Sequence, residues 1–316
     1  MRFGFISTLS VFTLLAQSLG ASVSCCGWSA HPDCNDHPSH CPCEWDVPYR
    51  EYGEWLPETP PLFRPFAADP RQVTYSVAWR FNDTAITKNA IPVSFGDICV
   101  LYEWNNVDFG WVSGPMQLGV EGALWAIFEP LNESSPLVDA DYYVGFPLTL
   151  RDGPWSYRLR GYHISTHIGD EFLLNHPGFD RRNPSAEFLD FSVSYEFTDE
   201  IRLYGLGGVI LHQDPSFPLK RWFVQGGSEI RLYRLGFVDY CQHLYGTPIF
   251  AMNFFYRPNF HGRVDATYIL GYEFGKLSGL QRRLRAFVEY HDGYSVEGQF
   301  CKLRTTYLSL RLTYGF

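Results

Sequence analysis

The last stretch of the chain, TTYLSLRLTYGF at residues 305–316, decides the fold. Apolar and polar residues alternate through it with period two, which places them on opposite faces of a β-strand. The polar face carries Arg311, and the apolar face consists of Leu308, Leu310, Leu312, Tyr314 and Phe316. One apolar and one polar face suit lipid outside and a polar lumen inside. The stretch therefore predicts the closing strand of a transmembrane β-barrel.

The N-terminus predicts export. Arg2 precedes a mostly apolar run at residues 3–16, and small residues follow at Ser18, Gly20 and Ala21. This order is typical of a secretory signal, here residues 1–21. No later stretch approaches the roughly 20 continuous apolar residues that a spanning helix needs. The mature chain is therefore expected to be periplasmic, secreted or a barrel.

The composition agrees with a barrel. Aromatic residues make up 17% of the chain and charged residues 19%, while the mean hydropathy is −0.16. Polar lumen residues and apolar lipid-facing residues offset one another in such proteins. The net charge of −9 argues against a nucleic-acid partner, which would need a basic surface. Nothing in the sequence indicates a cofactor, and membrane lipid is the expected surrounding.

Repeated period-two segments predict an all-β, antiparallel barrel of about twelve strands. An even count is typical of bacterial barrels. The division expected is a signal at 1–21, a Cys- and Pro-rich periplasmic leader at 22–71, and the barrel at 72–316. The expected strands are 73–81, 93–103, 116–128, 142–150, 155–167, 186–197, 201–211, 222–233, 249–256, 263–274, 282–290 and the terminal strand.

The connections are expected to alternate between short periplasmic turns and longer outer loops. Short turns at 151–153 and 198–200 and a long connection at 169–185 fit a periplasmic N-terminus. The connection at 234–247 is too long for an inner turn and 105–114 is borderline, so ten or fourteen strands stay open. In the strand at 263–274, parity puts Leu270 outside and Glu273 in the lumen. Charges of both signs then line the lumen, as a closed ladder of ion pairs in preference to a selective pore.

A strand that ends in Tyr314 and Phe316 is similar to the signal by which barrel-assembly machinery recognises its clients. The resemblance implies that machinery as a partner and an outer membrane of the Gram-negative type as the location.

The leader is rich in cysteine. In an oxidising compartment this crowding favours disulfides, within the chain or to other envelope proteins. A metal site is the alternative because histidines lie among the thiols, but the spacing does not match common zinc sites. The odd count leaves one thiol for Cys99, Cys241, Cys301 or another protein. The leader cysteines are Cys25, Cys26, Cys34, Cys41 and Cys43. A proline-rich connector at 48–70 then runs along the inner mouth of the barrel.

The densest polar cluster is GYHISTHIGDEFLL at residues 161–174. His163, Ser165 and His167 share one strand face, and parity makes it the lipid face. Polar groups facing hydrocarbon are costly without partners. The structural interpretation, which we favour from sequence, is a β-bulge near Gly161 that turns the histidines inward. It predicts a lumen cluster of Arg160, His163, His167, Asp170 and Glu171.

The pair His163 and Ser165 is similar to the His-x-Ser pair of outer-membrane phospholipase A and of lipid A deacylases. The resemblance implies a serine nucleophile, Ser165, activated by His163 on the outer wall. Glu187 has the parity for the orienting acid. The sequence departs from both families at Thr166, where they usually have Asn, and the spacing to Glu187 is longer than theirs.

Read across residues 158–172, R-x-R-G-Y-H-I-S-x-H-I-G-D-E-F resembles an uncharacterised chlamydia-type family of outer-membrane proteins, a domain of unknown function. That resemblance implies a barrel, leaves the activity open and agrees with disulfide cross-links in the envelope. The leading functional hypothesis is a structural or transport barrel that is not an enzyme. A phospholipid or lipid A acyl hydrolase and a surface ligand-binding barrel are the alternatives.

Overall fold

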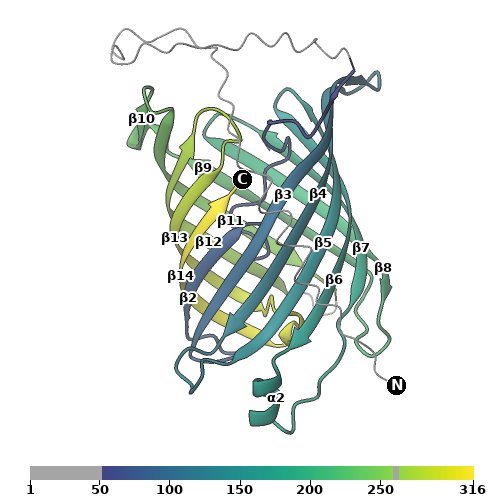
Figure 1. Cartoon of the computed structure of the whole chain (residues 1–316), viewed down its shortest axis with the longest axis vertical. Coiled ribbons are helices and arrows are strands. Elements are labelled where there is room, and N and C mark those ends of the chain that lie inside the picture. Colours follow the sequence, from purple (N-terminus) through teal and green to yellow (C-terminus); the bar gives the residue numbers. More distant parts are fainter. Residues whose placement is uncertain (1–51, 259–262) are drawn as a thin grey trace, which may run out of the picture. The chain divides into compact units, whose positions relative to one another are not determined.

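The alternating segments form a closed antiparallel barrel of 12 strands, as predicted. The computed structural model describes residues 52–258 and 263–316, and β3 pairs with both β2 and β4 to close the ring (Figure 1). The barrel strands are β2 (Tyr75–Phe81), β3 (Asn89–Asp108), β4 (Ser113–Phe128), β5 (Leu137–Asp152), β6 (Trp155–Ile168), β7 (Ala186–Glu196), β8 (Ile201–Gln213), β9 (Trp222–Arg231), β11 (Leu244–Tyr256), β12 (Val264–Lys276), β13 (Arg283–Tyr294) and β14 (Arg304–Gly315).

Two connections that left the strand count open are now explained. The long one after β9 contains a short 3-10 helix, η1 (Tyr233–Leu235), and a short strand, β10 (Phe237–Asp239), that pairs only with β11. The connection expected at 105–114 is shorter than predicted, because β3 continues to Asp108 and β4 begins at Ser113. Neither hides a pair of barrel strands, so the count stays at twelve.

The two ends of the barrel carry different connections. We call the end with the turns 153–154, 197–200 and 277–282 and the C-terminus the turn end. The loop end carries the connections 129–136, 169–185, 214–221 and 295–303. Figure 1 shows the helix α2 (Asp170–Asn175), within 169–185, at the loop end, away from the C-terminus. A second 3-10 helix, η2 (Gly298–Phe300), lies within 295–303.

The predicted alternation of faces is confirmed on the strands where it was worked out. Leu270 on β12 is 64% exposed, while Glu273 on the same strand is 0% exposed. Phe316 is the exception to the apolar face of the last strand, because it is only 5% exposed. Strand pairing ends at Gly315, so the alternation no longer constrains the next residue. The Phe316 ring instead packs under Arg282, whose Cζ lies 4.6 Å from the ring centroid.

Within residues 52–258 and 263–316, no helix has the length and apolar character needed to cross a membrane.

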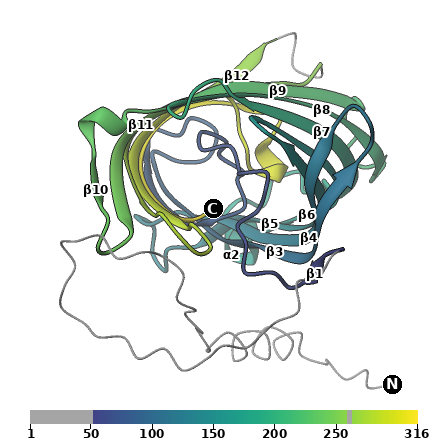
Figure 2. The same cartoon turned by 90° about the horizontal axis from the view of Figure 1, so that it is seen from above.

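The connector predicted at the mouth of the barrel enters the barrel instead. After β1 (Glu54–Trp55), which pairs with β3, residues 57–74 run through the ring of strands (Figure 2), and we call them the lumen segment. Burial of its apolar side chains stabilises this position, since Phe63 and Phe66 are only 2% and 3% exposed. The Phe66 ring stacks on Tyr204 at 3.9 Å between centroids. Backbone groups are satisfied by lumen side chains, as where the Ala67 N–H donates to Glu229 at 2.9 Å.

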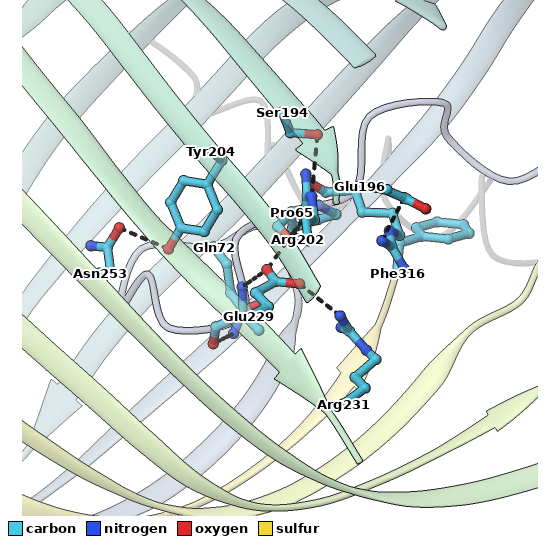
Figure 3. Close-up of polar contacts among 12 residues, drawn as sticks. Pro65, Gln72, Ser194, Glu196, Arg202, Tyr204, Glu229, Arg231, Asn253 and Phe316 are labelled. Atoms are coloured by element: carbon cyan, nitrogen blue, oxygen red, sulfur yellow. Dashed lines mark hydrogen bonds and ion pairs between the residues drawn. The ribbon is translucent and has the colours of Figure 1, made fainter. Parts of the chain in front are cut away.

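A ladder of buried ion pairs lies in the lumen, and Figure 3 shows the part of it formed by Arg202, Glu229 and Arg231. Glu229 binds Arg202 at 3.2 Å and Arg231 at 2.9 Å. Arg231 also binds Glu273 at 2.9 Å, and Glu273 binds Arg285 at 2.6 Å. Each charge of this ladder has a partner of opposite sign, which offsets the cost of burying it in the lumen.

Candidate membrane-facing site

The histidine of the sequence motif lies on the outside of the barrel, beside an acidic residue. The pairing of β6 with β7 places His163 opposite Glu187, and His163 Nδ1 lies 3.0 Å from Glu187 Oε1. A second histidine, His212 on β8, places its Nδ1 2.8 Å from Glu187 Oε2. We call His163, Ser165, Glu187 and His212 the outer-wall cluster.

A β-bulge explains the position of His212. In the pairing of β7 with β8, Glu187 is opposite His212 but Phe188 is opposite Ile210, so Leu211 is an extra residue. Strict alternation from the buried Ile210 would turn His212 inward; the bulge turns it outward instead. Sequence reasoning missed His212, and no signal in the chain marks it, because the bulge is a property of strand pairing.

The bulge predicted near Gly161 is absent, because β6 pairs with β5 and β7 in continuous register. The structure therefore does not bring together the predicted lumen cluster. Arg160 faces the lumen, where its Nη1 lies 2.9 Å from Glu121. His167 is exposed and makes an edge contact with Tyr142, 5.3 Å between ring centroids. The other two members, Asp170 and Glu171, are exposed in the first turn of α2.

Ser165 shares the outer face with His163, two residues along β6 and opposite Tyr142 on β5. Residues two apart on a strand are separated by roughly 6.6 Å, so side-chain rotation can bring the two groups together. Among the described residues, no hydrogen bond joins Ser165 to His163, and His163 Nε2 has no hydrogen-bond partner. A carboxylate that accepts Nδ1–H leaves Nε2 with a lone pair that can accept the proton of a hydroxyl.

The wall around the cluster is apolar. Leu159 on β6 is 44% exposed, Phe191 on β7 50% and Val144 on β5 42%. The cluster lies toward the loop end of these strands, since Glu187 is the second residue of β7. Polar groups at such a position are costly unless they are paired, and Glu187 pairs with both histidines. The arrangement can hold a base and a hydroxyl where a membrane ester could approach.

The five leader cysteines lie outside the described residues. Of the thiols suggested as partners for the odd one, Cys99 and Cys301 are free, the first exposed and the second buried. No group of three or more His, Cys, Asp or Glu side chains in the described part of the chain is arranged to hold a metal ion.

Fold and wall together define a barrel of the outer-membrane type. The chain belongs to the family described as protein of unknown function (DUF1207), whose model matches residues 46–316. This confirms the resemblance to an uncharacterised barrel family. No curated protein sequence matches the chain.

Solved structures of outer-membrane phospholipase A are similar in fold. The Escherichia coli enzyme shares 14% identity with a TM-score of 0.51, over 77% of this chain and 92% of its own. The Salmonella typhi phospholipase, a dimer with bound calcium, shares 14% identity with a TM-score of 0.51, over 78% and 93%. LpxR from Salmonella typhimurium shares 10% identity with a TM-score of 0.36, over 77% and 100%. At these identities the likeness shows the barrel fold alone.

Proposed function

We propose that this barrel is an outer-membrane acyl-ester hydrolase that acts on phospholipid or lipid A, with Ser165 as nucleophile, His163 as base and Glu187 as orienting acid. One observation carries the proposal. His163 Nδ1 lies 3.0 Å from Glu187 Oε1 on the membrane-facing wall, and Ser165 shares that face. A lumen position for His163 would have removed this function.

The chemistry follows from the tautomer that Glu187 holds. When Ser165 rotates to His163, Nε2 takes the hydroxyl proton as Oγ attacks the ester carbonyl carbon. The bond to the leaving alcohol breaks, and the alcohol takes the proton from Nε2. Water, activated by the same nitrogen, then cleaves the acyl-serine to release the fatty acid and restore the hydroxyl. The Glu187 carboxylate stabilises the imidazolium formed in each half of the cycle.

The main competing hypothesis is a structural or transport barrel. Transport through the lumen is disfavoured because the lumen segment and the ion pairs of Glu229 and Glu273 occupy it. The proposal places the loop end outside the cell and the N-terminus in the periplasm. Short turns face the periplasm in barrels of this type, and the turn end carries the turns 153–154, 197–200 and 277–282. Assembly through Tyr314 and Phe316, and disulfide links from the leader to envelope proteins, stay predictions.

The test is fatty-acid release by the purified full-length protein from phospholipid and from lipid A in mixed micelles. Ser165→Ala should abolish release, and His163→Ala should lower it by roughly 10²–10⁴-fold. A fluorophosphonate probe should label the wild type and not Ser165→Ala. Ser228→Ala is the matched control, because Ser228 is paired with the outward-facing Leu203 on β8, away from the cluster.

Heat-modifiable migration on gels reports whether each variant still forms the barrel. Lack of acyl release by the wild type from both lipids, or full release by a folded Ser165→Ala variant, would refute the hydrolase.

A further inference from the structure

A cavity of about 230 Å³ lies inside the barrel, between residues 65–73 of the lumen segment and the loop-end connections. We call it the lumen cavity. It is separate from the outer-wall cluster, because Tyr162 lines it while the next residue, His163, faces outward. A water molecule needs some 10–15 Å³ of such volume, so there is room for on the order of 15 waters or for one small organic molecule.

One wall of the lumen cavity is a continuous row of aromatic rings. Tyr162 stacks on Phe188 with 4.8 Å between centroids and an interplanar angle of 6°. Phe188 contacts Phe223 edge-on at 6.1 Å, and Phe223 contacts Phe255 at 5.8 Å. All four rings line the cavity. Such a row offers a flat or apolar ligand a large contact area at little cost in side-chain entropy.

Charges of both signs line the lumen cavity: Arg71, Arg158, Arg160 and Arg257, and Asp69, Glu121, Asp141, Asp190 and Asp265. In two of the clusters the arginine is more exposed than its carboxylate partners. Arg71 is 21% exposed and its partner Asp141 only 4%. Arg160 is 15% exposed, whereas its partners Glu121 and Asp190 are 2% and 0% exposed. In both clusters the guanidinium group is therefore the more accessible partner. Planar guanidinium groups match carboxylates in shape and charge.

The carboxylate of Asp69 also lines the cavity, but both of its oxygens are engaged. Oδ1 accepts the backbone N–H of Arg71 at 2.9 Å, and Oδ2 accepts Gln225 Nε2 at 2.9 Å. Arg160 is engaged in the same way, through Nε and Nη2 to Asp190 and Nη1 to Glu121. Arg71 uses Nε and Nη2 for Val296 and Asp141, so among the described residues its Nη1 is left to offer a ligand.

We propose that the lumen cavity binds a small organic carboxylate with an aromatic or apolar body. Arg71 binds its carboxylate through Nη1, and the aromatic row packs against its body. This activity is independent of the proposed hydrolase, because it uses the opposite face of the barrel wall.

Three probes with one indole body and different charge test the proposal: indole-3-acetate, tryptophol and tryptamine. Binding to the full-length protein in detergent is measured by calorimetry. Indole-3-acetate should bind at least about tenfold more tightly than tryptophol, and tryptamine most weakly, because only the acetate gains charge-assisted hydrogen bonds. Arg71→Gln should weaken indole-3-acetate by about tenfold. Arg304→Gln is the matched control, since Arg304 has a similar ion pair, 2.9 Å to Asp292, but does not line the cavity.

Chemical labelling of two free thiols, Cys99 and Cys301, tests where the ligand binds without any substitution. Cys301 lines the lumen cavity, whereas Cys99 is exposed and does not line it. Indole-3-acetate should slow N-ethylmaleimide labelling of Cys301 and leave that of Cys99 unchanged, as read by peptide mass spectrometry. The proposal is overturned if no probe binds at millimolar concentration or if tryptophol or tryptamine binds as well as the acetate. Unchanged Cys301 labelling at saturating indole-3-acetate would place the ligand elsewhere and also overturn it.

Discussion

Glu187 and Glu273 are both strand glutamates with more than one partner, but they lie on opposite faces of the barrel wall. The Glu273 side chain is 0% exposed and binds Arg231 and Arg285 in the lumen. The Glu187 side chain is 44% exposed and binds His163 and His212 on the outside. Glu273 cannot lose its carboxylate without stranding guanidinium groups, which are always charged, whereas the partners of Glu187 are histidines near the loop end of the wall. The buried ion pairs of the lumen should therefore contribute most to the stability of the barrel, whereas the outer-wall cluster should contribute less and be able to rearrange.

Replacing each glutamate by glutamine should change the free energy of unfolding by different amounts on the two faces. Glu273→Gln leaves the guanidinium groups around it without their carboxylate, so we expect barrel stability to fall by about 3–5 kcal/mol. Glu187→Gln keeps an acceptor for the histidine N–H groups and strands no guanidinium group, so it should change stability by no more than about 1 kcal/mol. Urea unfolding in detergent, followed by tryptophan fluorescence and by heat-modifiable migration, measures both. Equal losses at the two positions would show that burial does not separate the two clusters.

A smaller effect is expected at Glu297, in the connection 295–303. Burial raises the pKa of its carboxyl, but the charges of Arg80 and Arg71 outweigh burial and bring the pKa from 4.5 to about 2. A lowered pKa contributes stability that is complete above the unfolded value and is lost as pH falls toward the folded value. The wild type should therefore lose on the order of 1–2 kcal/mol from this group between pH 5 and pH 3.

Glu297→Gln is the control for that loss, because it removes the titrating group. Unfolding free energies at pH 5 and pH 3 should differ less in the variant than in the wild type. If both lose the same amount, the ion pair of Arg80 with Glu297, 3.1 Å long, does not stabilise the loop end.

The smallest effect concerns His212, which acts through Glu187 and would be a positioning residue for the proposed hydrolase. His212→Ala frees Glu187 Oε2 and lets the carboxylate rotate away from His163, so kcat should fall by roughly 3–10-fold with little change in KM. His212→Gln, which keeps a donor, should recover part of the rate. A change confined to KM would instead place His212 in substrate binding.

The strands were predictable because a half-buried strand records its environment at every second residue. The apolar Leu270 faces lipid and the charged Glu273 faces the lumen, so the residue types themselves indicate the two faces of the wall. The lumen segment was placed less well. Phe63 and Phe66 show that this connector must bury its apolar side chains, but their partners Arg158 and Arg202 come from distant strands.

The sequence by itself determined a barrel of about twelve strands, the faces of those strands and the polar character of the His163 to His167 stretch, since these depend on local alternation and composition. It left ten or fourteen strands open, because two connections had lengths that alternation alone does not explain. Only the tertiary structure decided that His163 meets Glu187, that a bulge at Leu211 brings His212 to the same carboxylate, and that Arg160 pairs with Glu121 in the lumen. These depend on register between strands, and a shift of one residue reverses every side chain of a strand. Local alternation sets which residues share a face, and pairing between strands sets which of them touch.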